Sequence, residues 1–141
     1  MSFTTRAKVR FADVDPAGIV FYPRYFEMLN AAVEDWFAQG LGVDFATLHL
    51  KRRLGTPTVR LECDFLVPSE LGDTLDIEIG VASLGRTSCN IAYRVSGGGV
   101  DRLRAKAVLV CMDLDAQKAV PWPDDLRAAI GRDLVEPATA T

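Results

Sequence analysis

Apolar residues in this chain follow a helical period in one long stretch and a strand period almost everywhere else. From residue 24 to 38 they recur every three or four positions, which is typical of a helix with one buried face. The other stretches alternate apolar and polar residues, as half-buried antiparallel strands do. These stretches are 3–11, 59–65, 75–81, 89–95 and 102–114. The order predicts an α+β fold in which a five-stranded antiparallel sheet wraps around one long helix.

Two of these elements also carry a specific expectation about packing. On the helix, Phe26, Leu29, Val33 and Phe37 share the apolar face. The last strand is apolar on both faces near its end, because Val108, Val110 and Met112 line its second side. A strand of this kind usually lies in the middle of a sheet or against another subunit, so we expect an oligomer.

The composition fits a single domain that spans residues 1–141. A chain of 141 residues with 49% hydrophobic residues can build a core but is too short for two ordinary domains. The tail 121–141 contains a candidate short helix at 124–130, and residues 137–141 are expected to fray. The net charge of -3 argues against a general nucleic-acid partner. With no signal-peptide core and no apolar run near ~20 residues, we expect a cytoplasmic protein without membrane insertion.

Three cysteines, Cys63, Cys89 and Cys111, all fall within expected strands. They have no CxxC spacing, and their number is odd. We therefore expect reduced thiols that pack in the core, rather than a disulfide framework or a metal site.

The segment 13–25 joins the first strand to the helix and is the candidate catalytic site. Pro23 fits the first helical position, which makes Tyr22 the expected cap residue. Free backbone N–H groups and the positive end of the helix dipole would gather there and polarise a carbonyl oxygen. Asp15 lies seven residues upstream of Tyr22, across a turn that contains Gly18. A carboxylate and an oxyanion hole would then flank one reacting carbon, as acyl transfer requires.

Two other interpretations of Asp13 and Asp15 compete with this one. Aspartates at the end of a strand commonly form Asx turns and have no catalytic role, and the residues alone leave that interpretation open. An Asp-x-Asp pair also occurs in metal-dependent phosphatases. That site needs a buried parallel strand before the motif, and the charged residues Arg6, Lys8 and Arg10 argue against it.

Residues 15–25, with the sequence DPAGIVFYPRY, resemble the signature of the hot-dog-fold 4-hydroxybenzoyl-CoA thioesterases of the aspartate-nucleophile type, and more broadly of related acyl-CoA thioesterases. Gly55-Thr56-Pro57 and Arg86-Thr87-Ser88 match that family in spacing, and the resemblance extends from the first strand to the last. It implies a hot-dog fold and hydrolysis of an acyl-CoA, 4-hydroxybenzoyl-CoA or a related aryl-CoA, to the free acid and CoA. It also implies a homotetramer built from dimers, with sites between subunits and no cofactor or metal besides the substrate's own CoA.

The resemblance further implies a role for individual residues. Asp15 would attack the thioester carbonyl or activate water for that attack, while the backbone N–H of Tyr22 holds the oxygen. The substrate-binding residues would be Gly18, Tyr25, Asn30, Thr56 and Pro57, and the CoA-binding residues Arg86, Thr87 and Ser88. Thr87 replaces a basic residue of the family and Gly85 an arginine, so Arg52 and Arg53 are considered as another source of positive charge.

Asn30 departs from the family pattern. It falls on the apolar helix face and is expected to point into the protein, where an amide needs hydrogen-bond partners. The 4-hydroxybenzoyl enzymes carry an aspartate at this position, which receives the substrate's phenol hydroxyl. An asparagine can bond that hydroxyl but is uncharged, so a different acyl group and a purely internal amide both remain open.

The other acidic residues of the helix and the sole histidine are weaker candidates for a catalytic role. Many relatives carry a histidine where Pro23 stands, so His49 is expected to pack in a loop, and Glu34 and Asp35 to lie on a solvated helix face. A hot-dog dehydratase or hydratase needs a histidine and acid pair, for which His49 provides no motif. Two alternatives remain: a module that binds acyl-CoA or acyl carrier protein without hydrolysis, and a thioesterase for short or medium aliphatic acyl-CoA.

Overall fold

The computed structural model describes residues 1–135 of the chain. Its main elements are strand β1 (Phe3–Lys8), helix α1 (Tyr22–Asp35), strands β3 (Thr58–Phe65), β4 (Thr74–Leu84), β5 (Ser88–Gly97) and β6 (Val100–Val110), and helix α2 (Asp124–Gly131). Shorter elements are the 3-10 turn η1 (Phe11–Asp13), the π-helical turns η2 (Trp36–Leu41) and η3 (Ala46–Lys51), and strands β2 (Leu54–Gly55), β7 (Met112–Asp113) and β8 (Lys118–Ala119).

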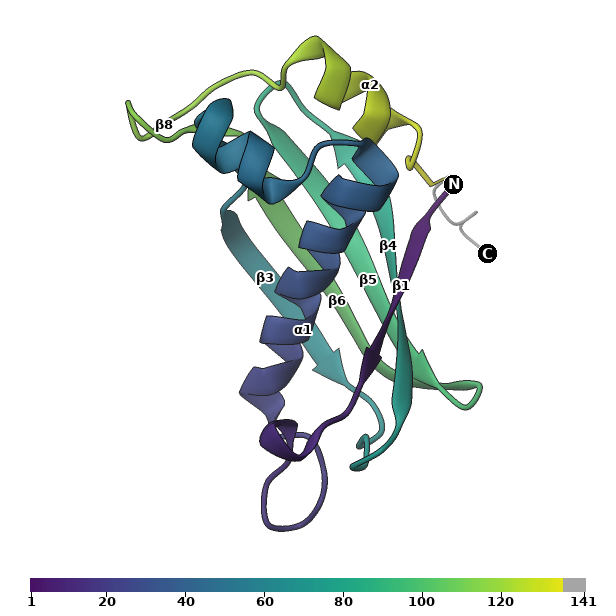
Figure 1. Cartoon of the computed structure of the whole chain (residues 1–141). Helices are drawn as coiled ribbons and strands as arrows, with labels where there is room; N and C mark the ends of the chain where they lie inside the picture. Colours follow the sequence, from purple (N-terminus) through teal and green to yellow (C-terminus); the bar gives the residue numbers. More distant parts are fainter. Residues whose placement is uncertain (136–141) are drawn as a thin grey trace.

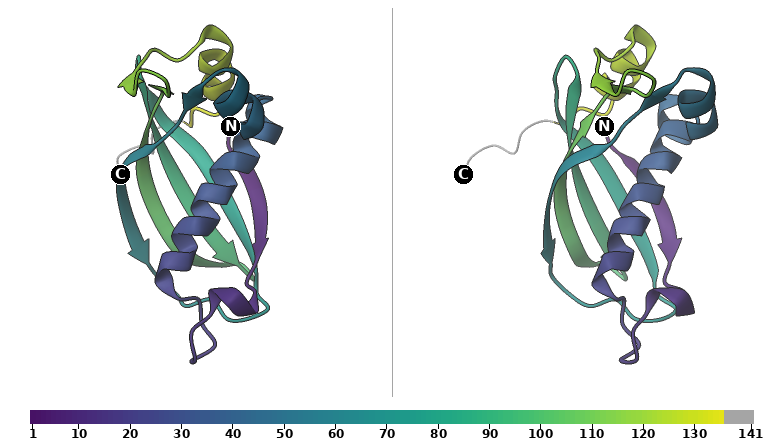
Figure 2. Two further views of the ribbon diagram at one scale, coloured as in Figure 1. Left: turned by 60° about the vertical axis from the view of Figure 1, so that its left-hand side comes forward. Right: turned by 90° about the vertical axis from the view of Figure 1, so that its left-hand side faces the viewer.

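The long strands form one antiparallel sheet in the order β1-β4-β5-β6-β3, and β2, β7 and β8 form a small second sheet. Helix α1 lies across one face of the large sheet, and α2, η3 and β8 gather at the end where α1 finishes (Figure 1). Figure 2 shows the sheet and α1 as two layers, and no further layer covers the opposite sheet face within residues 1–135. The predicted five-stranded antiparallel sheet with one long helix is confirmed.

The core lies between α1 and the inner face of the sheet. Leu29, Val33 and Phe37 are buried as expected, and Phe26 is half-buried. The alternate inward residues of β4, β5 and β6 complete this layer, for example Ile79, Ile91, Leu103 and Leu109. β6 lies between β5 and β3, so the strand with two apolar faces is central in the sheet, one of the two expected positions.

Three expected boundaries are wrong. The first strand ends at Lys8, because the Asp13 carboxylate accepts a hydrogen bond from the Arg10 N–H (2.8 Å) and folds the chain into η1. Phe11, expected on the inward face, is therefore 83% exposed. The last long strand ends at Val110, and the chain beyond it pairs with β2 as β7.

The third boundary is the start of the helix. The cap residue of α1 is Phe21, one position earlier than expected, so Tyr22 is already helical and Pro23 lies in the first turn. The helical path continues through η2 and stops at Gly42, which adopts φ 81, a left-handed conformation that glycine permits.

Cys89 and Cys111 are buried, Cys63 is half-buried, and all three are free thiols. Burial raises the pKa of the Cys89 thiol to about 12, which suits a packing role. The candidate short helix near the end is α2, whereas residues 137–141 lie outside the described part of the chain. Between residues 1 and 135, no helix is both long and apolar enough to cross a bilayer.

Candidate active site

Asp15 opens a tight hairpin between β1 and α1. Its N–H donates to the Ile19 carbonyl (3.0 Å), and the Gly18 N–H donates to the Asp15 carbonyl (2.9 Å). Gly18 has φ 79, a conformation that other residues rarely adopt. An isolated bridge between Val14 and Val20 closes the base of the hairpin. The local sequence therefore presents Asp15 on a defined turn.

The two aspartates of the motif have different surroundings. Asp13 caps η1 through the Arg10 N–H, whereas Oδ1 of Asp15 accepts the Ala17 N–H (2.9 Å). Asp15 thus makes the Asx contact of the simpler interpretation, whereas the Asp13 contact is the capping-box bond of η1. However, Oδ2 of Asp15 has no hydrogen-bond partner within residues 1–135, and the residue is half-buried. One oxygen of Asp15 holds the turn while the other is available for chemistry.

The first turn of α1 begins directly after this hairpin. The Phe21 N–H donates to the Asp13 carbonyl (2.9 Å), which ties the helix start to the turn, and the Arg24 N–H donates to the Phe21 carbonyl (2.8 Å). The Tyr22 N–H makes no hydrogen bond to any other part of the described chain. A free N–H at the positive end of a fourteen-residue helix is suited to hold a developing oxyanion.

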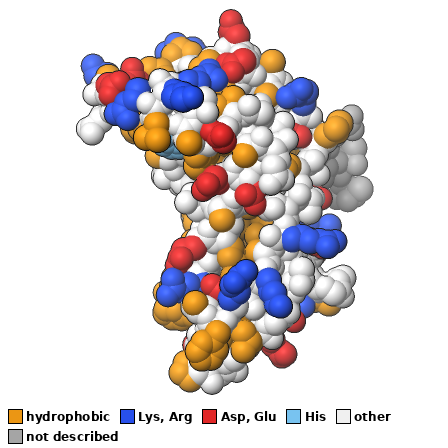
Figure 3. All heavy atoms as spheres, in the orientation of Figure 1, with side chains coloured by type: hydrophobic (Ala, Val, Ile, Leu, Met, Phe, Trp, Pro, Cys, Tyr) orange, Lys and Arg blue, Asp and Glu red, His pale blue; other side chains and the backbone are white. Residues whose placement is uncertain are grey.

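Aromatic rings surround the helix start. The Phe65 ring at the end of β3 lies 6.0 Å from the Tyr22 ring and 6.1 Å from the Tyr25 ring, measured between centroids. A cavity of about 230 Å³ opens here, and Ile19, Val20, Tyr22, Tyr25, Phe65, Val67, Pro68 and Arg102 line it. Figure 3 shows hydrophobic side chains gathered at this lower end of the molecule. Tyr25 itself is buried, and its hydroxyl donates to Oγ of Ser69 (2.9 Å).

The prediction that Asn30 points into the protein is wrong for the described chain, where Asn30 is exposed. It follows Leu29 on the helix and so turns toward the edge strand β3, which no further strand covers within residues 1–135. Asn30 lines a cavity of about 240 Å³ together with Phe26, Leu29, Thr58, Leu61 and Tyr93.

Tyr93 was not among the predicted site residues. It points inward from β5 toward the same cavity as Asn30, and burial raises the pKa of its hydroxyl. Its signal in the sequence is a tyrosine at an inward position of an alternating strand, where a hydroxyl has no obvious partner. The cavity therefore combines an apolar lining with three polar side chains, Asn30, Thr58 and Tyr93, from different elements.

The remaining predicted site residues lie at the opposite end of the sheet. Thr56 and Pro57 precede β3, while Arg86 and Thr87 lie in the turn between β4 and β5, next to α2, and Ser88 begins β5. β4 has eleven residues, which at about 3.3 Å each make a strand roughly 35 Å long between this turn and the Asp15 end. One protomer therefore brings Asp15, Gly18, Tyr22 and Tyr25 together but leaves Thr56, Pro57, Arg86, Thr87 and Ser88 far from them.

The arginines at that far end differ in availability. Arg52 makes two hydrogen bonds of 2.8 Å to the Asp125 carboxylate, and Arg53 pairs with Asp115 (2.9 Å). The Arg86 side chain, in contrast, is exposed and forms no ion pair within the described residues. Of the three, Arg86 alone has a guanidinium free to meet a phosphate.

His49 and the helix acids lie apart from the hairpin. Nδ1 of His49 contacts the Phe45 carbonyl (2.9 Å), and the two rings pack edge to face, so the residue has the packing role expected of it. Glu34 is exposed on α1, while Asp35 accepts a hydrogen bond from the Thr5 hydroxyl (2.9 Å).

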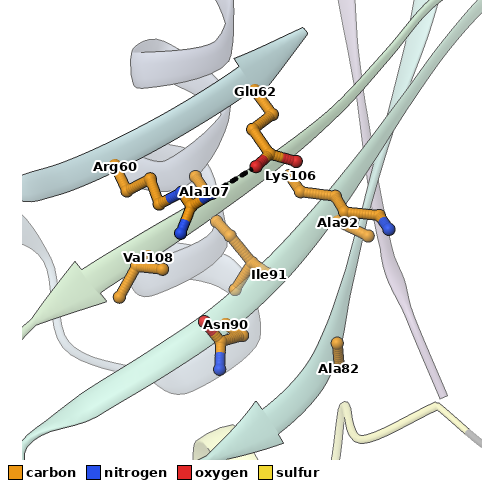
Figure 4. A pocket seen from close by; sticks show the side chains of 9 residues that line it. All are labelled: Arg60, Glu62, Ala82, Asn90, Ile91, Ala92, Lys106, Ala107 and Val108. Atoms are coloured by element: carbon orange, nitrogen blue, oxygen red, sulfur yellow. Dashed lines mark hydrogen bonds and ion pairs between the residues drawn. The ribbon is translucent and has the colours of Figure 1, made fainter.

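A separate hollow of about 300 Å³ lies on the sheet face opposite α1 (Figure 4). Its floor contains small side chains such as Ala82 and Ala92, and its rim includes the ion pair between Arg60 and Glu62 (2.7 Å). None of the predicted site residues lines it, so it is distinct from the hairpin site.

Comparison with known proteins identifies the family of the chain. Residues 9–130 match the model of the thioesterase-like superfamily. A 1,4-dihydroxy-2-naphthoyl-CoA hydrolase of Thermosynechococcus vestitus is 33% identical over 121 residues, which are 85% of this chain and 82% of the relative.

Solved structures show the same similarity. The 4-hydroxybenzoyl-CoA thioesterase from Pseudomonas sp. strain CBS-3 superposes with a TM-score of 0.83 at 30% identity, over 91% of this chain and 98% of that chain. A 1,4-dihydroxy-2-naphthoyl-CoA thioesterase from Synechocystis gives a TM-score of 0.84 at 26% identity, over 97% and 100% of the two chains. The predicted hot-dog fold, family and enzyme class are confirmed: the chain belongs to the thioesterase-like superfamily of hot-dog thioester hydrolases.

Proposed function

We propose that this protein hydrolyses an aryl-CoA thioester, 4-hydroxybenzoyl-CoA or a related hydroxylated aryl-CoA, to the free acid and CoA. One observation carries the proposal. The hairpin that bears the free carboxylate oxygen of Asp15 leads directly into the start of α1, where the Tyr22 N–H is free. Two of the relatives act on hydroxylated aromatic acyl-CoA thioesters, as their names state, which supports the aromatic acyl group.

In the proposed reaction, the thioester carbonyl oxygen accepts a hydrogen bond from the Tyr22 N–H. The Asp15 carboxylate either attacks the carbonyl carbon itself or removes a proton from a water that attacks. The negative charge that develops on the oxygen is stabilised by the Tyr22 N–H and the helix dipole. Collapse of the tetrahedral species breaks the C–S bond and releases CoA as the thiolate.

The two variants of the mechanism differ in the species that the collapse produces. If Asp15 attacks, the product is a mixed anhydride, which water cleaves to the free acid and the Asp15 carboxylate. If Asp15 acts as a base, the acid forms directly and Asp15 passes its proton to the leaving thiolate or solvent. Both routes use the same two groups, the Asp15 carboxylate of the hairpin and the Tyr22 N–H at the start of α1.

We further propose that the complete site forms between two copies of the chain. β3 is an edge strand, and the side chains of Val59 (61%), Leu61 (40%) and Phe65 (51%) are strongly exposed on its apolar side. A long apolar edge needs a cover. Antiparallel pairing of β3 with β3 of a second copy would bury this row and set the start of one strand beside the end of the other.

This arrangement would bring together the two groups of predicted site residues that lie at opposite ends of one protomer. Thr56 and Pro57 of one copy would lie near Phe65 of the other, and therefore near its Tyr22. Arg86 would approach from the same direction, which suits a CoA whose nucleotide end lies far from its thioester. Two such dimers would make the homotetramer that the family resemblance implies.

The cavity next to Asn30 and Tyr93 is the proposed position of the aromatic ring. Its volume of about 240 Å³ exceeds that of a single ring, and its lining is mainly apolar with an amide and a phenol at hand. Either polar group can bond a hydroxyl on the ring. An uncharged amide here favours a neutral phenol over a phenolate.

Thiol release from a panel of CoA thioesters tests the proposal. The panel contains 4-hydroxybenzoyl-CoA, 1,4-dihydroxy-2-naphthoyl-CoA, benzoyl-CoA, and aliphatic thioesters from acetyl to palmitoyl. We expect the hydroxylated aryl thioesters to give the highest kcat/KM and Asp15→Asn to abolish their turnover. Preference for aliphatic chains would refute the acyl group, and CoA binding without any thiol release would refute the hydrolytic function.

A further inference from the structure

A buried hydrogen-bond chain links β6, the loop before β4 and α1 directly beneath the hairpin. Arg102 on β6 donates from Nη1 to Oγ of Ser69 (3.2 Å) and to Oδ2 of Asp73 (2.8 Å). The Tyr25 hydroxyl donates to the same Ser69 oxygen (2.9 Å). Ser69 is fully buried, although no sequence pattern distinguishes it from an ordinary loop serine.

The backbone around Ser69 also forms hydrogen bonds to the hairpin. The Ser69 carbonyl accepts the Val20 N–H (2.9 Å), and two residues later the Leu71 N–H donates to the Gly18 carbonyl (3.0 Å). The isolated bridge between Ile19 and Glu70 lies between these two bonds. The segment 69–71 therefore forms a short antiparallel clasp along the C-terminal side of the hairpin.

The same serine contacts the other half of the site through its side chain. Tyr25 lies one helical turn after Tyr22, so the bond from its hydroxyl to Ser69 fixes the first turn of α1. Arg102 in turn fixes Ser69, because its Nη1 and Nη2 also donate to the carbonyls of Pro68 (3.2 Å) and Gly97 (3.0 Å). Only 13% of the Arg102 side chain is exposed, so this anchor is largely shielded from solvent.

We infer that Ser69, held between Tyr25 and Arg102, is a positioning residue that sets the Asp15 hairpin against the start of α1. Its backbone holds the hairpin and its hydroxyl accepts the bond from the helix, so Ser69 adds to the direct bond between Phe21 and Asp13 in setting how the Asp15 carboxylate faces the Tyr22 N–H. This inference rests on the proposed function of those two groups. Attack by a carboxylate requires reacting atoms about 3–3.5 Å apart, and a misplacement of 1 Å costs on the order of 100-fold in rate.

The test uses the full-length protein with Ser69→Ala and Tyr25→Phe, and Ser83→Ala as the matched control. Ser83 also accepts a side-chain hydrogen bond, from Asn90 (2.6 Å), but it is exposed and lies at the far end of β4. For Ser69→Ala we expect kcat for the best aryl-CoA to fall about 10-fold to 100-fold, with KM changed less than about threefold. Ser83→Ala should leave both constants within about twofold of wild type.

The double variant distinguishes positioning from general destabilisation. Tyr25 acts on the site through the Ser69 oxygen, so Tyr25→Phe added to Ser69→Ala should lower kcat no further, which is a non-additive result. Additive losses, or a lowered Tm with unchanged kcat, would overturn the inference. A loss confined to KM would overturn it as well.

Amide hydrogen exchange gives a readout that does not depend on catalysis. In Ser69→Ala and in Tyr25→Phe, exchange at the Val20 and Leu71 amides should accelerate about 10-fold or more, while amides in the centre of β5 keep the wild-type rate. Unchanged exchange at Val20 and Leu71 would overturn the inference even in an active enzyme. If the wild type hydrolyses no thioester, the proposed function fails, and the exchange rates still decide whether Ser69 holds the hairpin.

Discussion

The two ends of the sheet differ in how they hold their polar residues. At the lower end, near Asp15, three main-chain hydrogen bonds join the hairpin, the helix start and the segment 69–71, and the side chains of Tyr25, Ser69 and Arg102 support them from below. At the upper end, near α2, main-chain bonds such as that from the Trp122 N–H to the Arg86 carbonyl (3.1 Å) also hold the chain. Three arginine side chains are in addition engaged there: Arg52 binds Asp125, Arg53 binds Asp115, and Arg127 binds the Gly85 carbonyl (2.9 Å).

This contrast separates the tasks of the two ends. A backbone framework keeps a carboxylate oxygen and an N–H free at the lower end, where we propose that the thioester is cleaved. Side-chain ion pairs at the upper end engage Arg52 and Arg53 and leave Arg86, of these three arginines, for the proposed contact with a charged part of the substrate. Attack on a carbonyl requires reacting groups held in a fixed geometry, whereas binding of a phosphate depends mainly on a positively charged donor.

The largest expected effect comes from the lower end. Asp15→Asn should reduce kcat for aryl-CoA hydrolysis by about 1,000-fold or more, because an amide neither attacks nor accepts a proton. Asp13→Asn is the matched control, since an amide oxygen can still accept the Arg10 N–H. It should stay within about threefold of wild type. Equal losses in both variants would mean that the pair serves only to shape the turn.

The second prediction tests whether the two ends meet between subunits. Val59→Asp places a carboxylate on the exposed edge of β3. It should weaken the dimer by about 100-fold, because a buried, unpaired charge costs about 3 kcal/mol or more at an interface. Light scattering at a series of protein concentrations measures the dissociation, and thiol release measures the accompanying loss of activity.

Val100→Asp is the control for that variant, because Val100 is also exposed (45%) but lies at the turn between β5 and β6. It should leave both the assembly and the rate unchanged. A Val59→Asp protein that stays assembled would place the subunit contact elsewhere. A fully active monomer would show that one protomer contains the whole site.

The third prediction concerns the upper end. Arg86→Ala should raise KM for the CoA thioester about 10-fold with little change in kcat, since it removes a charge-assisted contact worth about 1.5 kcal/mol. Arg52→Ala should instead lower Tm and leave KM unchanged, because its guanidinium is bound to Asp125. An increase in KM for Arg52→Ala alone would reverse the assignment.

The smallest expected effect concerns pH and the anchor of the lower end. The Glu70 N–H and the Arg102 guanidinium hold the pKa of Asp73 below its usual range. A depressed pKa in the folded protein contributes stability above about pH 4, and this contribution is lost as the pH falls through the lower, folded pKa. Asp73→Asn should therefore lower Tm slightly at pH 7 and flatten its decline between about pH 5 and 3.

Thermal unfolding of both proteins across that pH range provides the measurement. Asp76→Asn is the comparison variant, because it removes an exposed ion pair with Arg6 and should shift Tm little at any pH. Parallel Tm curves for wild type and Asp73→Asn would show that Asp73 does not anchor the loop through its charge.

Much of the fold could be predicted from periodicity. Periodicity reports which face of an element each residue occupies, and a few residues suffice to specify that face. Examples are the alternation in 75–81 and 89–95 and the helical repeat of Leu29, Val33 and Phe37. Boundaries were harder to place, because alternation continues past Lys8 and the Asp13 cap that ends β1 is a single local contact. Asn30 was misplaced because its exposure depends on what covers β3, which the helix pattern does not report.

The catalytic candidate could be read from the amino-acid sequence, because Asp15, the Gly18 turn and the start of α1 are close neighbours in the chain and their contacts depend on local backbone preferences. Three other features are visible only in the folded chain. They are which arginines form ion pairs, the position of Ser69 beneath the hairpin, and the position of Thr56 and Arg86 at the end of the sheet opposite Asp15. The partners of Arg52 and Ser69 are 73 and 44 residues away in the chain. Such contacts depend on strand order and register, which arise from the packing of the whole sheet.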